Sequence, residues 1–343
     1  MRYRTIAGTD IEVSEVGFGV WTVAAGWWGD HSDEQAVTLL RQAYDRGVTF
    51  FDTADTYGNG RGETLIAQAF PGADRDDIVL STKFGYDWES NVGKRREGHQ
   101  EAPHCFEPAF LERALDASLR RLGTDHIDLY QLHNARLEHL HDDAVWSFVE
   151  RARAAGKIRS VGVALGPAIG WAEEGHYALE HLPVEVVHMI YNALELDPGR
   201  ELIATARRTG KSLLVRVPHS SGLLEGRYTE DTEFPEGDHR RHRPRAWLVD
   251  GVKKIEQLRF LERENGCALG QAALRFVLRA PEVVSVLPNI YDLAQLDEFV
   301  GAAAAPEITH AQAAHVEALF EANYGLPRAV EAGTASRDTA GTR

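Results

Sequence analysis

The sequence is poor in cysteine and has no long apolar run. Its 343 residues include two cysteines, Cys105 and Cys267, which lie far apart in the chain. They suggest neither a disulfide framework nor a CxxC site, so we expect a reducing compartment. No apolar run approaches the roughly 20 residues that a membrane helix needs, and residues 1–10 lack the apolar part of a signal peptide. These absences predict a soluble cytoplasmic protein with no membrane partner.

Positive charge is also scarce, because 37 Lys and Arg residues stand against 52 Asp and Glu residues. The net charge of −15 would repel nucleic acid and anionic membrane surfaces, so neither is an expected partner. Hydrophobic residues make up 43% of the chain, which is enough for a large core, and one α/β barrel of this length is common. We predict a single domain over residues 1–328 and a disordered tail over 329–343.

A repeated order of helix, glycine and apolar run indicates a parallel sheet. Ser32 and Gln35 form a capping box at the start of one helix, which ends at Gly47. Pro108 opens another helix, which ends at Gly123. Each such glycine is soon followed by an apolar run that we predict to be a strand. The predicted strands begin near residues 16, 48, 78, 127, 158, 185, 213 and 283. Eight strands favour a closed (β/α)8 TIM barrel over an open sheet.

Two segments fall outside this repeat. Residues 3–7 and 11–18 predict a β-hairpin at the N-terminus, around Gly8-Thr9-Asp10. The segment between strands seven and eight is long, roughly residues 218–281, and its pattern predicts extra helices near 248–264 and 268–280.

Three of the predicted strands end in a polar side chain. In Phe50-Phe51-Asp52-Thr53-Ala54-Asp55-Thr56-Tyr57-Gly58, an apolar run ends at Asp52 and Tyr57 follows five residues later. Two further runs end at Lys83 and at His133. Active sites in such barrels lie at the carboxyl ends of the strands. We therefore expect Asp52, Tyr57, Lys83 and His133 to meet at one site, although each alone could be an ordinary polar residue at a loop edge.

The stretches FFDTADTYG, STKFG and DLYQLH resemble the signatures of the aldo-keto reductases, and the resemblance covers roughly residues 1–325. It implies an NAD(P)H-dependent oxidoreductase that interconverts a carbonyl (an aldehyde, ketone or sugar) and an alcohol. No side chain supplies a hydride, so a nicotinamide cofactor is required. The resemblance makes Tyr57 the proton donor, assisted by Lys83 and Asp52, and makes His133 the residue that orients the substrate. Asp52 and Lys83 could instead form only a buried ion pair.

The same resemblance implies cofactor contacts, at several of which this chain departs from the family pattern. The Ser-Asn pair that grips the nicotinamide carboxamide is replaced by Ala164 and Leu165, and the glutamine in the next strand is replaced by His188. The usual cation after strand eight is replaced by Tyr291, and Arg216 stands where an aromatic often stacks on the nicotinamide. The predicted cofactor-binding residues are Trp21, His188, Arg216, Arg240, Arg243 and Asn289.

Cofactor preference depends on the arginine-rich segment 238–245, which the resemblance places over the cofactor pyrophosphate. Because the 2′-phosphate of NADP needs local cations, we predict NADP, with NAD possible. The arginines could also be a solvated surface paired with nearby carboxylates.

Tryptophans near the first and third strand ends predict the substrate pocket, which comprises Trp21, Trp27, Trp28 and Trp88. Their aromatic faces suit sugars and aromatic aldehydes, and the nearby Asp30 and Glu89 favour a polar, sugar-like carbonyl. They could also be rim packing. No metal site is predicted, because His139, His141 and Glu138 have no ordered further ligand nearby in the sequence.

Two alternative functions remain open from the sequence. The first is an enzyme of the same fold that retains its nicotinamide and performs an internal redox step. The second is a non-catalytic regulatory binding module, similar to the potassium-channel β-subunits of the same family. The sequence leaves the oligomeric state open.

Overall fold

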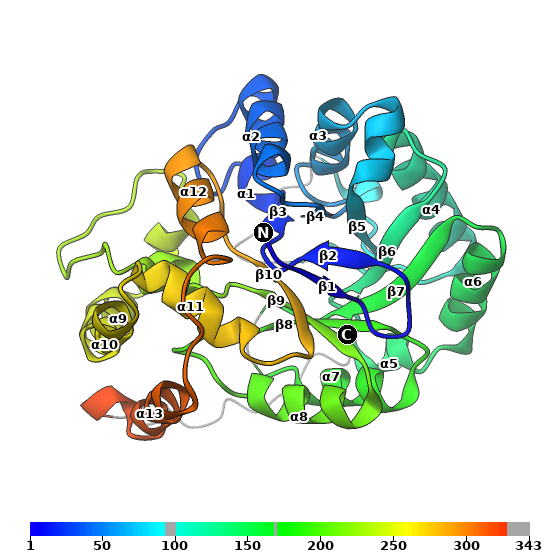
Figure 1. Cartoon of the computed structure of the whole chain (residues 1–343). Helices are drawn as coiled ribbons and strands as arrows, with labels where there is room; N and C mark the ends of the chain where they lie inside the picture. The colour runs from blue at the N-terminus through cyan, green and yellow to red at the C-terminus, as the bar shows by residue number, and fades with distance from the viewer. Residues whose placement is uncertain (93–100, 168–169, 328–343) are drawn as a thin grey trace, which may run out of the picture.

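The computed structural model describes residues 1–92, 101–167 and 170–327. Within them, eight parallel strands form a barrel whose strand order follows the chain, with helices around it (Figure 1). The predicted (β/α)8 barrel is thereby confirmed. The predicted tail at 329–343 lies outside the described residues. The barrel strands are β3 (Phe18–Gly19), β4 (Phe50–Asp52), β5 (Val79–Phe84), β6 (Ile127–His133), β7 (Ile158–Ala164), β8 (Val186–Ile190), β9 (Ser212–Arg216) and β10 (Val283–Leu287).

The first and last barrel strands close the sheet through a short parallel bridge. Val16 pairs with Val286, and the Gly17 nitrogen donates to the Val286 carbonyl at 2.9 Å. A Cβ on Gly17 would lie 2.7 Å from the Phe50 side chain and 2.9 Å from that of Leu287. Glycine is therefore required where the closing strand crosses the packed interior.

The helices begin and end largely where the sequence places the caps. Ser32 caps α2 with the predicted capping box, Pro108 is at the first turn of α4, and Gly123 ends α4 in the left-handed conformation with φ 64°. The helices are α1 (Trp21–Ala24), α2 (Asp33–Asp45), α3 (Arg61–Ala69), α4 (Pro108–Leu122), α5 (Leu137–Leu140), α6 (Asp143–Ala154), α7 (Ala172–His181), α8 (Gly199–Thr209), α9 (Arg245–Leu258), α10 (Phe260–Asn265), α11 (Leu269–Leu278), α12 (Leu293–Gly301) and α13 (His310–Glu321).

The predicted N-terminal hairpin is present and closes one end of the barrel. Its strands β1 (Tyr3–Thr5) and β2 (Glu12–Ser14) pair antiparallel and lie across that end (Figure 1). Ile6, Ile11 and Val13 join a buried cluster with apolar side chains of barrel strands, among them Phe50 and Leu129. Because apolar side chains fill this end, a ligand has to enter from the other one.

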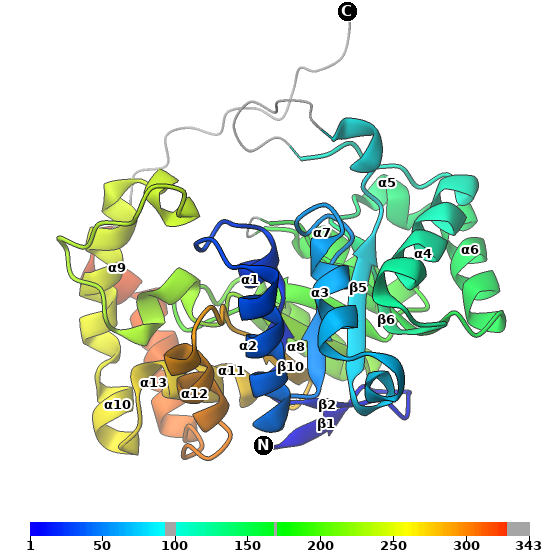
Figure 2. The same ribbon diagram turned by 90° about the horizontal axis from the view of Figure 1, so that it is seen from above.

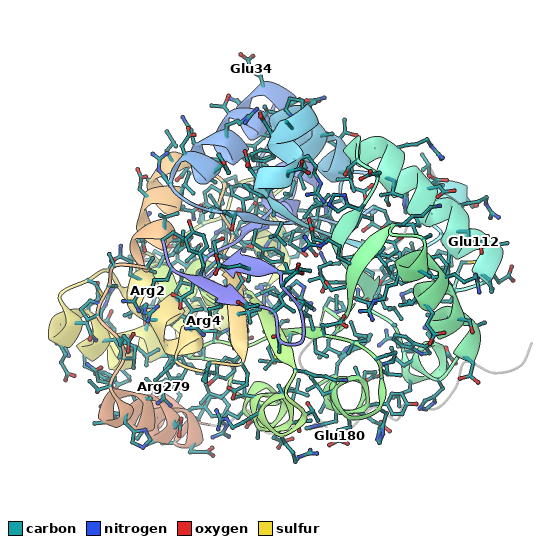
Figure 3. The ribbon with its side chains drawn as sticks, turned by 45° about the vertical axis from the view of Figure 1, so that its right-hand side comes forward. Arg2, Arg4, Glu34, Glu112, Glu180 and Arg279 are labelled. Carbon is teal, nitrogen blue, oxygen red and sulfur yellow. The ribbon has the colours of Figure 1, made fainter. Side chains whose placement is uncertain are left out.

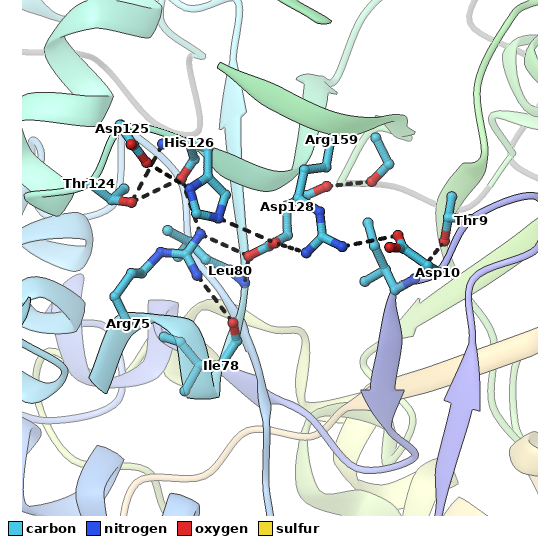
Figure 4. A network of polar contacts seen from close by, with 12 residues as sticks. Thr9, Asp10, Arg75, Ile78, Leu80, Thr124, Asp125, His126, Asp128 and Arg159 are labelled. Atoms are coloured by element: carbon cyan, nitrogen blue, oxygen red, sulfur yellow. Dashed lines mark hydrogen bonds and ion pairs between the residues drawn. The ribbon is translucent and has the colours of Figure 1, made fainter. Parts of the chain in front are cut away.

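An ion-pair network fastens the hairpin turn to the barrel (Figure 4). The buried Asp128 carboxylate on β6 accepts hydrogen bonds from Arg75 at 2.8 Å and from Arg159 at 2.7 Å. Arg159 also donates to Asp10 in the turn at 3.0 Å. Two guanidinium groups on one buried carboxylate satisfy its charge and most of its lone pairs.

The connection from β9 to β10 differs in detail from the prediction. The helix expected near 248–264 is two helices, α9 and α10, which meet at Arg259. The helix expected near 268–280 is α11. Two 3-10 turns, Ser220–Glu225 and His239–His242, precede α9, and the second lies at the end of the barrel away from the hairpin (Figure 2).

Charged side chains cover the outer helices, as the composition requires. Glu34, Glu112 and Glu180 are exposed on α2, α4 and α7 and point away from the barrel (Figure 3). No helix within the described ranges is long and apolar enough to cross a membrane.

Candidate active site

A cavity of about 570 Å3 opens at the carboxyl ends of the barrel strands. All four predicted catalytic residues line it, and so do five of the six predicted cofactor-binding residues. The four are Asp52, Tyr57, Lys83 and His133, and the five are Trp21, His188, Arg216, Arg243 and Asn289. These residues come from strands and loops across the whole chain, and the parallel barrel brings them together.

Lys83 and Asp52 form a buried ion pair on adjacent strands. The Lys83 Nζ donates to Asp52 Oδ1 and to the Thr53 carbonyl, both at 2.6 Å. The other oxygen, Asp52 Oδ2, accepts from Ser81 at 2.9 Å and from Gln131 at 3.0 Å. Burial lowers the pKa of Lys83, but Asp52 and then Tyr57 raise it, and the net pKa lies above its ordinary value. Lys83 is therefore a fixed cation beneath the cavity.

Tyr57 stands in the turn between β4 and α3, directly above this ion pair. The Lys83 Nζ is 4.9 Å from the centre of the Tyr57 ring, and the nearby Tyr57 phenol helps to raise the pKa of Lys83. The turn needs glycine at position 58, because φ is 61° there and a Cβ would meet the Ala24 carbonyl at 2.5 Å. The glycine that follows the tyrosine thus lets the loop approach α1 and fixes the phenol over Lys83.

His133 ends β6 with its ring edge-on to Tyr57, at a centroid distance of 5.9 Å. Burial, followed by the charges of Lys83 and Arg216, lowers its pKa well below the ordinary value. The ring is therefore neutral near pH 7 and carries one N–H. Its buried Nδ1 has no hydrogen-bond partner among the residues that the structure describes.

The side of the cavity opposite Lys83 carries a second cation, Arg216, and a second histidine, His188. Arg216 on β9 lies four strands from Lys83 on β5, which is half-way around an eight-stranded barrel. Its Nη2 donates to the Leu165 carbonyl at 2.7 Å and to the Gly166 carbonyl. On β8 between them, His188 is 2% exposed, and neither ring nitrogen has a partner within the described part of the chain.

The tryptophans divide into two groups. Trp21, Trp27 and Trp28 line the cavity and surround the ring of His239, whose centroid lies 4.5 Å from that of Trp28. The His239 backbone nitrogen also donates to the Trp27 carbonyl at 3.1 Å. This contact joins the 3-10 turn before α9 to the loop after α1, so the two loops meet over the cavity. Trp88 lies elsewhere and does not line the cavity.

Trp88 instead covers a buried acid behind the site. The Trp88 side chain is one of the groups that lower the pKa of Asp55 against the effect of burial, and the Arg121 guanidinium lies 5.6 Å from the Trp88 ring centre. Burial and then the nearby Glu63 raise the pKa of Asp55 well above its ordinary value. Trp88 was predicted to line the substrate pocket. Its position away from the cavity does not support that prediction.

The arginines of segment 238–245 have different surroundings. Arg240 is 8% exposed, pairs with Asp238 and stacks on Trp28, with its guanidinium carbon 4.4 Å from the ring centre. It does not line the cavity. Arg243 does line it, and its Nη2 lies 3.3 Å from the Ser221 hydroxyl. Of the two predicted arginines, Arg243 is the one whose position allows direct contact with a cofactor.

Sequence reasoning missed several residues of the cavity wall, notably Asn134, Ser221 and His239. Asn134 has φ 53° and Ser221 has φ 55°, left-handed conformations that a sequence pattern does not reveal. Asn134 donates to the Tyr86 hydroxyl at 2.7 Å. His239 lies within the arginine-rich segment, and nothing in the sequence distinguishes its ring from the charged side chains beside it. The described residues contain no cluster of three or more His, Cys, Asp or Glu suited to a metal ion.

The fold and the cavity define a (β/α)8-barrel protein with a site at the carboxyl ends of its strands, built on a Tyr, Lys, Asp and His cluster. In comparisons with known proteins, residues 15–321 match the aldo/keto reductase family. The chain therefore belongs to the aldo/keto reductase family and is an NAD(P)-dependent oxidoreductase.

Individual relatives agree with this assignment over most of their length. The Schizosaccharomyces pombe aldo-keto reductase yakc, whose name carries NADP(+), is 31% identical over 297 residues, which cover 84% of each chain. The NADH-specific methylglyoxal reductase of Escherichia coli is 26% identical over 310 residues, 88% of this chain and 93% of that relative. The solved holo structure of aldo-keto reductase AKR11C1 from Bacillus halodurans has a TM-score of 0.72 and 27% identity, over 93% of this chain and 96% of that one.

Proposed function

We propose that the protein reduces a small polar carbonyl compound with a nicotinamide cofactor, with Tyr57 as the proton donor. The observation that carries this proposal is the stack of Asp52, Lys83 and Tyr57 beside His133 at the floor of one cavity. A proton donor held against a buried cation is the arrangement that carbonyl reduction needs. The low cysteine content supports a cytoplasmic location.

The residues of the cavity fit a nicotinamide cofactor. The buried His188 ring is neutral, because burial and then the charge of Arg216 lower its pKa well below the ordinary value. A neutral imidazole offers one N–H donor and one acceptor, which match the oxygen and the amino group of a carboxamide. His188 would hold the nicotinamide carboxamide, and Arg243 would contact a phosphate at the rim. When bound, the cofactor supplies the hydride, with its two electrons, to the carbonyl carbon.

The chain itself handles the proton and the substrate oxygen. Tyr57 donates its hydroxyl proton to the carbonyl oxygen as the alcohol forms, and the Lys83 ammonium stabilises the negative charge left on the phenol. Asp52 holds Lys83 in place. His133, being neutral, donates its single N–H to the substrate oxygen and orients it. The clustered side chains of Trp21, Trp27 and Trp28 form an apolar wall for the substrate.

NADP is the cofactor that we favour, with NAD as the second choice. One relative is named with NADP(+) and another is named NADH-specific, so relatives at this level of similarity include both. Arg243 at the rim supports NADP, since its guanidinium can form charged hydrogen bonds with a phosphate. For the substrate we propose a short polar carbonyl, with a sugar as one candidate. The name methylglyoxal reductase of one relative supports the small size.

The direct test is to follow the nicotinamide absorbance of purified protein with NADPH or NADH and a panel of short 2-oxoaldehydes, aldoses and long-chain aldehydes. We expect multiple turnovers, with higher kcat/KM for the short polar compounds. Higher kcat/KM for the long-chain aldehydes would contradict the proposed substrate class. Partner capture without any change in nicotinamide absorbance would instead support the regulatory binding module.

A second candidate, an enzyme that retains its nicotinamide for internal redox chemistry, is favoured by the contact between His239 and Trp27 over the cavity. A loop joined there would slow cofactor exchange. Purified protein that carries a nicotinamide, and does not exchange it with labelled NADPH during turnover, would support this candidate over the first.

A further inference from the structure

The cavity has an excess of positive charge that the proton-donor group does not need. Lys83 is matched by Asp52 at 2.6 Å, so this pair is close to neutral as a unit. Arg216 is different, because both of its hydrogen bonds go to neutral backbone carbonyls. It forms no ion pair among the residues described in the structure, and Asp52 is the single carboxylate among those residues that lines the cavity.

Neighbouring histidines do not offset this charge. His133 and His188 face Arg216 from β6 and β8, and the positive charge of Arg216 helps to keep both neutral. Burial lowers the pKa of Arg216 itself, but a guanidinium stays protonated in proteins. One uncompensated positive charge is therefore fixed on the β7–β9 side of the site.

The geometry of carbonyl reduction determines which group lies next to the Arg216 guanidinium. Carbonyl reduction requires the substrate oxygen next to Tyr57 and His133, on the β4–β6 side of the cavity. The hydride donor has to approach the carbonyl carbon from another direction, and the wall across the cavity from Lys83 carries His188 and Arg216. A nicotinamide ring that reacts here is therefore close to the Arg216 guanidinium.

The two redox forms of nicotinamide respond differently to a nearby cation. The reduced ring is neutral and the oxidised ring carries one positive charge, whereas the phosphates are the same in both. We propose that Arg216 makes the site bind the reduced cofactor more tightly than the oxidised cofactor, so that the potential of the bound couple is raised, the bound nicotinamide is a weaker hydride donor than in solution, and NADP+ is a weak product inhibitor. This inference rests on the proposed function, because it assumes that the nicotinamide reacts in this cavity.

The expected size of the effect follows from the charge. Two like charges a few Å apart at a protein's effective dielectric change an equilibrium by about tenfold or more. Arg216→Met removes the charge and keeps a long side chain. We expect it to lower the ratio of the NADP+ to the NADPH dissociation constant about tenfold, which equals a shift of about 30 mV in the potential of the bound two-electron couple.

The experiment measures both dissociation constants, by quenching of tryptophan fluorescence, for the wild type, Arg216→Met and Arg216→Lys. The Lys variant keeps the charge and should keep a ratio near that of the wild type, even if both affinities fall. Arg243→Met is the matched control. It should weaken both forms equally and leave the ratio unchanged, because the phosphates do not differ between the forms. If Arg216→Met does not fold by circular dichroism, Arg216→Gln, which can still donate to the Leu165 carbonyl, takes its place.

The outcomes separate this inference from the function on which it rests. Binding of both forms with an equal ratio in the wild type and the uncharged variant would overturn the role of Arg216 and leave the proposed function standing. A Lys variant whose ratio matches that of the Met variant would also overturn it, because charge would then not be the cause. Failure of the wild type to bind either form would overturn both.

Discussion

The Lys83 ammonium and the Asp52 carboxylate lie 2.6 Å apart and are almost completely buried. Among the residues that the structure describes, the other hydrogen bonds of this pair go to a neighbouring strand or to the chain just after β4, namely to Thr53, Ser81 and Gln131. The pair therefore has one geometry, and the phenol above it has a cation in a fixed position. A buried pair of this kind tolerates the loss of both charges better than the loss of one.

Lys83→Met should abolish turnover and also destabilise the fold, because it leaves the Asp52 charge buried without its partner. We expect the free energy of unfolding to fall by about 3–5 kcal/mol, measured by urea denaturation. The double variant Lys83→Met/Asp52→Leu should recover most of this stability and remain inactive. A double variant no more stable than Lys83→Met would show that the ion pair is not the cause.

Tyr57→Phe should remove the proton donor and leave the cavity shape unchanged. We expect kcat to fall by about 10²–10⁴-fold, the usual contribution of a general acid, with the NADPH dissociation constant unchanged. Tyr44→Phe is the matched control, because Tyr44 packs on Phe70 outside the cavity. Near-native kcat in Tyr57→Phe would remove Tyr57 from the proposed role.

Arg243→Ala should weaken cofactor binding if the guanidinium contacts a phosphate. Loss of one charged hydrogen bond costs about 1.5–3 kcal/mol, and the wild-type affinity should decrease with added salt more steeply than that of the variant. Arg241→Ala is the control, since Arg241 is exposed and does not line the cavity. A loss for NADPH alone would assign Arg243 to the 2′-phosphate, and an equal loss for NADH would assign it to the pyrophosphate. No loss for either would make Arg243 a solvated surface residue.

Glu225 should make the protein less stable as the pH rises. Its side chain is 6% exposed, and burial raises its pKa from 4.5 to about 7, with Gln295, Glu298, Arg227 and Arg240 as smaller influences. Because the folded state holds this proton more tightly than the unfolded chain, stability falls between about pH 4.5 and 7 and then levels off. The full penalty above pH 7 is at most about 3 kcal/mol.

The test for Glu225 compares urea denaturation of the wild type and Glu225→Gln at about pH 5 and pH 8. The variant should gain stability relative to the wild type as the pH rises. Glu256→Gln, an exposed carboxylate on α9, should show no such trend. An equal difference at both pH values would contradict the assigned burial effect.

Much of the fold and the centre of the site could be predicted from local patterns. Asp52, Lys83 and His133 each end an apolar run, and parallel strands bring such ends to one rim whatever the side-chain detail. The caps at Ser32 and Pro108 and the stop at Gly123 depend on residues next to them in the chain, so the sequence placed those helix ends well. The break at Arg259 between α9 and α10 is not marked by a proline or glycine, so the sequence pattern predicted one continuous helix there.

The sequence by itself determined the strand order, the hairpin and the meeting of Asp52 with Lys83, because these follow from periodicity and from backbone rules that act over short distances. Only the tertiary structure decided where the long side chains go. Arg240 and Arg243 are three residues apart, yet one pairs with Asp238 beneath Trp28 while the other lines the cavity. A flexible guanidinium binds whichever carboxylate, ring or carbonyl the fold brings within reach, and that neighbour is known only when distant segments have packed.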